Sequence, residues 1–128
     1  MTSGRSVIVK QFPRVLDAQG SQAFFQELAP HLATDRPCLV FDLSDVRYLD
    51  SAGVDLLLRS MEEAMKRNGD VKLAALSPET AAILEMTRTD RLFEIFDSCS
   101  DAVESFYRFS AQSLQPERAL DVNPQGER

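Results

Sequence analysis

The chain has 128 residues, 44% of them hydrophobic and 27% charged, which is the size and composition of one globular domain with a single core. The formal net charge of -6 argues against direct binding to nucleic acid or to an anionic membrane surface, because both attract clustered Lys and Arg side chains. No apolar stretch approaches the roughly 20 residues that a membrane span needs, and no signal peptide is visible, so we expect a cytoplasmic protein.

The first half of the chain alternates between strand and helix patterns. The β-branched run Val7–Phe12 predicts a strand that Pro13 ends. The polar segment Asp17–Gly20 predicts a turn, and the apolar residues of Gln22–Ala33 recur at the spacing of one helix face. Cys38–Leu43 is an almost continuous apolar run, which is typical of a strand covered on both faces.

The second half continues this alternation. Helical periodicity over Ala52–Asn68 is followed by a strand pattern over Val71–Leu76. Ser77 and Pro78 then predict the N-cap and the first position of a helix that runs to Thr87. Alternating strands and helices predict an α/β fold with a mixed or parallel sheet and helices on its faces.

The last elements are a predicted edge strand over Leu92–Phe96 and a predicted helix over Ser100–Phe109. Residues 111–128 include two prolines and little apolar content, so we expect a domain over residues 1–110 followed by a disordered tail over 111–128. The apolar residues expected to face the core on the last three helices are Leu57, Met61, Met65, Ile83, Leu84, Met86, Val103, Phe106 and Tyr107.

Most of the chemistry-bearing residues lie between the apolar strand and the helix that follows it. They are Asp42, Ser44, Asp45 and the turn Asp50-Ser51-Ala52-Gly53. In open α/β sheets, loops at the carboxyl ends of strands are where ligands and partners bind. Either Ser51 or Asp50 alone would be an ordinary helix N-cap. A phosphate on Ser51 would meet the positive end of the helix dipole while nearby aspartates repel it, so we expect phosphorylation to alter partner binding rather than stability.

Enzyme and cofactor functions have little support in the residues. The single His31 has no nucleophile motif with it, and the chain has neither a GxGxxG nor a Walker-type phosphate loop. Asp42, Asp45 and Asp50 could suggest a Mg²⁺ site, but such residues are more often turn and capping residues. Cys38 and Cys99 fit no metal-binding spacing and are expected to be buried, reduced thiols. We therefore expect no enzymatic activity, no cofactor and no metal.

The segments Leu39–Ser44 and Tyr48–Val54 closely resemble the signature of STAS domains, specifically of bacterial anti-sigma-factor antagonists. The similarity covers about Val7 to Phe109. Other stretches that agree with the family in order and spacing are Val15-Leu16-Asp17, Asn68-Gly69-Asp70, Leu76-Ser77-Pro78 and Asp90-Arg91-Leu92-Phe93. The resemblance implies a mixed four- to five-stranded sheet flanked by about four helices.

The resemblance also implies a function. In the family, the serine that matches Ser51 is phosphorylated by an anti-sigma factor with serine-kinase activity, and a PP2C-type phosphatase reverses this. The unphosphorylated antagonist binds the anti-sigma factor and frees the sigma factor. The residues of this chain that match the docking surface are Asp17, Asp42, Ser44, Asp50, Ser51, Ala52 and Gly53. An alternative is a STAS-type accessory subunit of a lipid-transport ABC complex, without a phospho-switch.

Three departures from the family pattern carry expectations. The usual extra N-terminal strand is expected to be absent or very short, because only Met1 to Ser6 precede the first strand. Arg88 stands where the family often has Gly, which matters if the backbone needs a positive φ there. Asp55 replaces a small residue and adds negative charge near Ser51, which would influence the choice of kinase.

Overall fold

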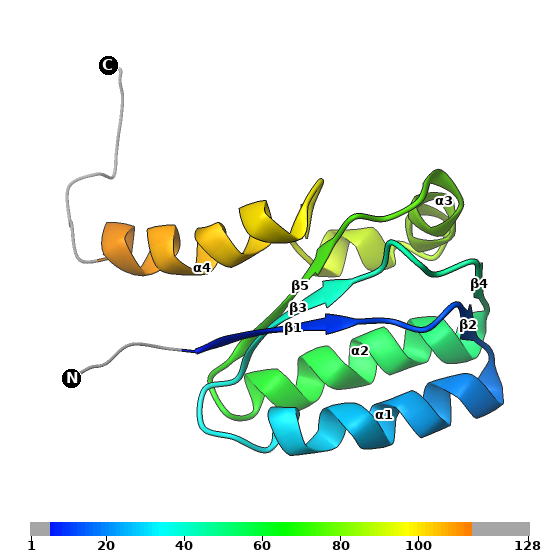
Figure 1. The fold of residues 1–128 in the computed structure, drawn as a ribbon, viewed down its shortest axis with the longest axis horizontal. Helices are drawn as coiled ribbons and strands as arrows, with labels where there is room; N and C mark the ends of the chain where they lie inside the picture. The colour runs from blue at the N-terminus through cyan, green and yellow to red at the C-terminus, as the bar shows by residue number, and fades with distance from the viewer. Residues whose placement is uncertain (1–5, 114–128) are drawn as a thin grey trace.

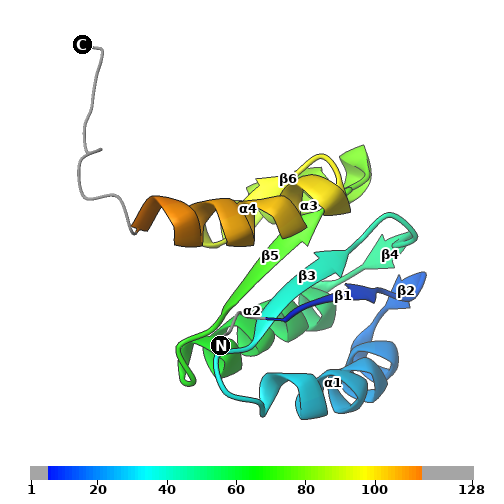
Figure 2. The same cartoon turned by 60° about the vertical axis from the view of Figure 1, so that its left-hand side comes forward.

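The structure is a computed structural model that describes residues 6–113. Its centre is a four-stranded sheet in the order β1-β3-β5-β6, and every pair of neighbours runs parallel (Figures 1 and 2). The strands are β1 (Val7–Gln11), β3 (Cys38–Asp42), β5 (Asp70–Ala74) and β6 (Ile95–Phe96). A separate two-stranded parallel ribbon joins β2 (Val15–Leu16) to β4 (Tyr48–Leu49). The α/β class and the four-stranded sheet are confirmed, and no antiparallel pair occurs among these strands of residues 6–113.

The helices form layers on the two faces of this sheet. They are α1 (Ala18–Leu32), α2 (Ser51–Met65), α3 (Pro78–Met86) and α4 (Cys99–Ser113), with a short 3-10 turn η1 (Thr89–Leu92). The pair α1 and α2 lies on one face and α4 lies on the other, while α3 lies near the carboxyl ends of the strands (Figures 1 and 2). The four predicted helices are therefore confirmed, and their arrangement brings the carboxyl ends of β1 and β3 beside the ribbon.

The face under α1 and α2 holds the main apolar core. Leu39, Phe41 and Leu73 point into it from the sheet, and Leu28 and Leu57 meet them from the two helices. All five side chains are fully buried. At about 25 cal/mol for each Å² of apolar surface removed from water, this layer is the main source of stability for the fold.

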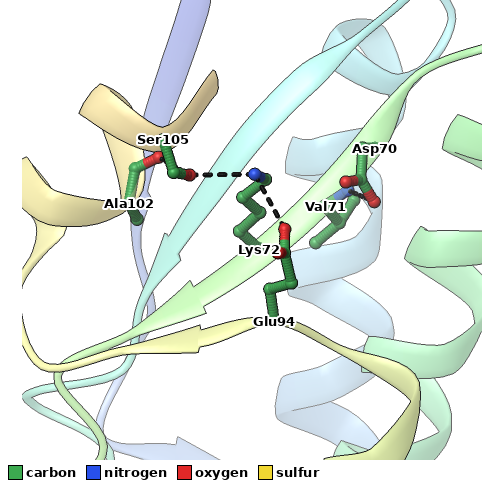
Figure 3. A network of polar contacts seen from close by, with 6 residues as sticks. All are labelled: Asp70, Val71, Lys72, Glu94, Ala102 and Ser105. Atoms are coloured by element: carbon green, nitrogen blue, oxygen red, sulfur yellow. Dashed lines mark hydrogen bonds and ion pairs between the residues drawn. The ribbon is translucent and has the colours of Figure 1, made fainter. Parts of the chain in front are cut away.

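The face under α4 contains a smaller apolar cluster and a buried charge. The apolar part consists mainly of Cys38, Val40, Ala74, Ala102 and Phe106. Beside it, the Lys72 side chain on β5 is only 5% exposed. Its Nζ lies 2.8 Å from Glu94 Oε1 and donates to Ser105 Oγ on α4 at 2.8 Å (Figure 3). The same ammonium lies 4.4 Å from the centre of the Phe106 ring. A polar network therefore connects α4 to the sheet.

Helix α1 begins earlier than the sequence predicted. Asp17–Gly20 was expected to be a turn before a helix at Gln22, but Asp17 is the N-cap and the helix starts at Ala18. The Asp17 carboxylate accepts from the backbone N–H of Gly20 at 2.8 Å. A Cβ on Gly20 would lie 2.6 Å from the Val15 carbonyl oxygen, so glycine here lets the first helical turn press against β2.

Other boundaries differ for local reasons. Helix α2 ends at Met65, three residues before the predicted end, because Asn68 takes a left-handed conformation with φ 64°. The N–H groups of Asn68 and Gly69 then bond back to Met65 and Ala64, as in a Schellman cap. Only Ile95–Phe96 of the predicted strand at Leu92–Phe96 is a strand, since η1 ends at Leu92.

Some inward-facing predictions are wrong. Met65, Met86 and Tyr107 were expected to face the core, but all three are largely exposed.

Helix α4 continues to Ser113, three residues past the predicted domain end at 110. The rest of the predicted tail, and nearly all of the segment preceding the first strand, lie outside the described residues.

The backbone at Arg88 has a positive φ, as the family pattern suggested. Its φ is 61° and its ψ is 16°, which is the left-handed region. For a residue with a Cβ, this conformation raises the free energy of the backbone by about 1–2 kcal/mol. The departure from Gly at this position therefore places strain in the turn between α3 and η1.

Candidate functional site

The predicted site residues lie at one end of the molecule. There, the carboxyl ends of β1 and β3 lead to the ribbon of β2 and β4, and both α1 and α2 begin directly after the ribbon (Figure 1, right). Leu16 and Leu49 are register partners, so Asp17 and Asp50 follow them side by side. The Asp50 N–H also donates to the Leu16 carbonyl at 3.4 Å. The tertiary structure thus places two helix N-termini and their caps next to each other.

Asp50, and not Ser51, is the N-cap of α2. Its Oδ1 accepts from the Ala52 N–H at 2.9 Å, and its Oδ2 accepts from the Tyr48 hydroxyl at 3.5 Å. Ser51 is the first helical residue and is exposed. Within residues 6–107, the Ser51 hydroxyl has no hydrogen-bond partner. Because Asp50 does the capping, the hydroxyl of Ser51 stays available for chemistry.

The close packing of α2 on the ribbon depends on Gly53. A Cβ at this position would lie 2.9 Å from the Leu16 carbonyl oxygen and 3.0 Å from Leu49 Cγ. Any side chain would therefore push the first turn of α2 away from the ribbon. Gly53 thus positions Ser51 and does not itself offer a contact group.

The loop after β3 is held by its own carboxylates. Asp42 Oδ1 accepts from the Ser44 N–H at 3.0 Å, and Asp45 Oδ2 accepts from Gln11 Nε2 at 2.8 Å. The interpretation of Asp42 and Asp50 as turn and capping residues is confirmed. In the described part of the chain, no three His, Cys, Asp or Glu side chains gather where they could hold a metal ion.

A cysteine that the sequence did not link to the site lies beside Asp42. Cys99, the first residue of α4, is half-buried, whereas Cys38 is fully buried as predicted. Burial raises the pKa of the Cys99 thiol, and the charge of the Asp42 carboxylate together with a hydrogen bond to it raises this pKa further. The thiol is therefore held in its unreactive, protonated form. The long separation in sequence hides this contact from pattern analysis.

A groove of about 280 Å³ runs between the N-terminal halves of α1 and α2. Ala52 and Asp55 line it on the side of Ser51, and Arg59 lies over the Phe25 ring at 4.3 Å. Ser21 also lines the groove, and its buried Oγ has no hydrogen-bond partner among the residues that are described. The site therefore combines an exposed serine, several carboxylates and an adjacent hollow.

None of the described helices is long and apolar enough to cross a membrane.

Comparisons with known proteins agree with this architecture. The STAS-domain family pattern matches residues 4–102. A STAS-domain containing protein of Pseudomonas aeruginosa is 32% identical over 76 residues, which is 59% of this chain and 75% of that protein. An anti-sigma-factor antagonist (STAS) domain protein from Planctomyces limnophilus superposes with a TM-score of 0.69 at 20% identity, covering 76% of this chain and 87% of that one.

The STAS domain of a SulP transporter from Vibrio cholerae superposes with a TM-score of 0.66 at 15% identity, covering 87% of this chain and 89% of that one. At such low identities, both structures show a shared fold. The same fold thus occurs in an antagonist-type protein and in a transporter domain, so function must be argued from the site.

Proposed function

This chain belongs to the STAS-domain family, and we propose that it is an anti-sigma-factor antagonist whose binding is switched by phosphorylation of Ser51. In the unphosphorylated state, it binds an anti-sigma factor with serine-kinase activity, and the sigma factor is released. A PP2C-type phosphatase returns phosphorylated Ser51 to the binding state. The protein works in the cytoplasm and carries out no reaction itself.

The main support for this proposal is that Asp50 and Ser51 have different structural roles. Asp50 caps α2, so adding a phosphate to the exposed Ser51 removes no hydrogen bond from the fold. The phosphate would add about -1.5 to -2 charges. The helix dipole favours this charge by roughly 0.3–1 kcal/mol, and Asp50 and Asp55 oppose it. The fold therefore tolerates a modification that a partner pressed against α2 does not.

The proposed docking surface consists of the matched family residues and the start of α2, with the buried Gly53 acting only by positioning Ser51. Asp17 and Asp50 adjoin across the ribbon, and Asp42 and Ser44 lie in the loop after β3. Ala52 borders the groove between α1 and α2. A phosphate on Ser51 would lie on this surface, which gives the switch its physical basis.

The test is phosphorylation in vitro followed by peptide mass spectrometry. The purified chain is incubated with ATP and each serine-kinase anti-sigma factor encoded in its own genome. We expect one phosphate on Ser51, and none on the Ser51→Ala variant. Ser100→Ala is the matched control, since Ser100 is another exposed serine in the first turn of a helix and lies outside the proposed docking surface, and it should be phosphorylated like the wild type. Absence of phosphate on Ser51 with every kinase would overturn the proposal.

Binding provides the second half of the test. We expect Ser51→Asp to weaken binding to the phosphorylating anti-sigma factor at least about tenfold, or 1.4 kcal/mol, whereas Ser100→Asp at the start of α4 should have a smaller effect. Equal binding by Ser51→Asp and wild type would favour the adaptor function in a lipid-transport ABC complex, where the phosphorylation state is irrelevant.

A further inference from the structure

The ribbon of β2 and β4 has one buried and one exposed face. Leu16 and Leu49 point inward and are buried. Their neighbours Val15 and Tyr48 are also register partners, and they point the other way. Val15 is 48% exposed and Tyr48 is 51% exposed. Two apolar side chains thus form a small solvent-facing patch, which we call the ribbon patch, beside the proposed phosphorylation site.

The Tyr48 hydroxyl makes a long, exposed contact with the same carboxylate that caps α2. Its hydroxyl lies 3.5 Å from Asp50 Oδ2, while Asp50 Oδ1 accepts from the Ala52 N–H. This contact favours one orientation of the exposed ring. Exposed, pre-oriented aromatic rings are the side chains that most often carry binding energy at protein interfaces.

We propose that the ribbon patch of Val15 and Tyr48 is the apolar anchor by which the anti-sigma factor holds this protein, an inference that rests on the proposed function. The occupant is a folded protein with an apolar pocket for the Tyr48 ring. The pocket rim is basic where it faces Asp50 and Asp55. It is acidic where it faces the exposed residues Arg14 and Arg47, which precede the two anchor residues in the chain.

This anchor explains how a phosphate on Ser51 weakens partner binding without a change of fold. Ser51 directly follows the residue that positions Tyr48. Binding requires water to leave the ribbon patch and its rim, and a doubly charged phosphate at this rim keeps water there. The gain from burying Tyr48 and Val15 is then lost together with the basic contacts.

The chain supplies matched control residues for both anchor positions. Tyr107 on α4 is 52% exposed and Val9 on β1 is 45% exposed, which are nearly the exposures of Tyr48 and Val15. Neither control residue belongs to the ribbon. The same substitution is therefore made at each anchor residue and at its control residue. A difference in binding between the two variants then comes from the position of the side chain and not from its type.

The experiment measures the affinity of each variant for the anti-sigma factor that phosphorylates Ser51, by isothermal titration calorimetry. We expect Tyr48→Ala to weaken binding at least about thirtyfold and Val15→Ser about fivefold. Tyr107→Ala and Val9→Ser should stay within about twofold of the wild type. Thermal unfolding of every variant checks that the fold is kept.

A conservative variant separates the ring from the hydroxyl. Tyr48→Phe keeps the apolar anchor and should bind within about threefold of the wild type. A loss as large as that of Tyr48→Ala would overturn the anchor, because the hydroxyl would then carry the interaction. Equal losses for Tyr48→Ala and Tyr107→Ala would also overturn it. If Ser51→Asp still weakens binding in that case, the proposed function stands. If the wild type binds no such kinase, both fail.

Discussion

The two faces of the central sheet are covered by different kinds of side chains. The face under α1 and α2 is filled by large apolar side chains such as Phe41 and Leu57, and none of the charged side chains of the described residues is buried there. The face under α4 has small apolar side chains such as Ala74 and Ala102, and it buries the charged Lys72, whose ammonium contacts the half-buried Ser105 and the mostly exposed Glu94. The helix that carries Ser51 thus rests on the apolar face, while α4 is attached partly by directional contacts.

This difference suggests separate tasks for the two layers. Apolar packing is dense and tolerates little displacement, so it suits the layer that must hold Ser51 and the ribbon in register. An intact polar contact contributes little net stability. Removing only one of its two partners is costly, because the other partner is left buried and unpaired. We therefore expect substitutions on the two faces to differ in both the size and the sign of their effects.

The largest effect is expected for Leu57→Ala on α2. Leu57 is fully buried in the apolar face, so its truncation should lower the free energy of unfolding by about 2–5 kcal/mol. Urea denaturation measures this change. Met65→Ala on the same helix is the control, and because Met65 is largely exposed it should stay within about 0.5 kcal/mol. Similar values for the two variants would contradict the assignment of the main core to this face.

The next effect concerns the buried ammonium under α4. Glu94→Gln keeps an acceptor oxygen beside Lys72 but removes the negative charge that faces the buried ammonium, so stability should fall by about 1–2 kcal/mol. Lys72→Met removes the charge at similar volume, so stability should be unchanged or rise by about 1 kcal/mol. The same denaturation measurement compares them. If Lys72→Met were the more damaging variant, the ammonium itself would be essential to the attachment of α4.

The smallest effects are expected at two serines on opposite faces. Ser105 Oγ accepts from Lys72 and donates to the Ala102 carbonyl at 2.7 Å, so Ser105→Ala should cost about 1 kcal/mol. Ser21 Oγ on α1 is buried without a partner in the described structure, so Ser21→Ala should be neutral or stabilising by up to about 1 kcal/mol. Effects of the same sign, measured by thermal unfolding, would remove this contrast between the faces.

Local patterns predicted much of the fold because their causes are local. Ser77 caps α3 and Pro78 occupies its first turn, as the sequence indicated. The apolar run at Cys38 became the buried strand β3, since only a sheet interior accommodates so continuous an apolar segment. The predicted helix over Ala52–Asn68 stops at an asparagine, and Asn68 takes the left-handed conformation that Asn adopts more readily than most residues.

The errors arose where long-range contacts overrule local preference. Asp17–Gly20 has turn chemistry, but packing against β2 makes it the start of a helix. Met65 and Met86 are the last residues of α2 and α3, where helical spacing continues beyond the core that could cover it, whereas Tyr107 lies within α4 next to the buried Phe106 but is itself 52% exposed. Periodicity states which residues share a face, and only the neighbouring elements decide how far that face is buried.

The sequence alone determined the α/β class and a helix that begins near Ser51, and it predicted Ser51 as the best candidate for modification, because these depend on residue types at short spacing. Only the tertiary structure decided which residue caps α2 and which side chains surround Ser51. Parallel pairing of β2 with β4 brings Val15 to Tyr48 and Asp17 to Asp50 across more than 30 positions of chain. No local pattern specifies such a pairing, because it is selected by the packing of the whole sheet and its helices.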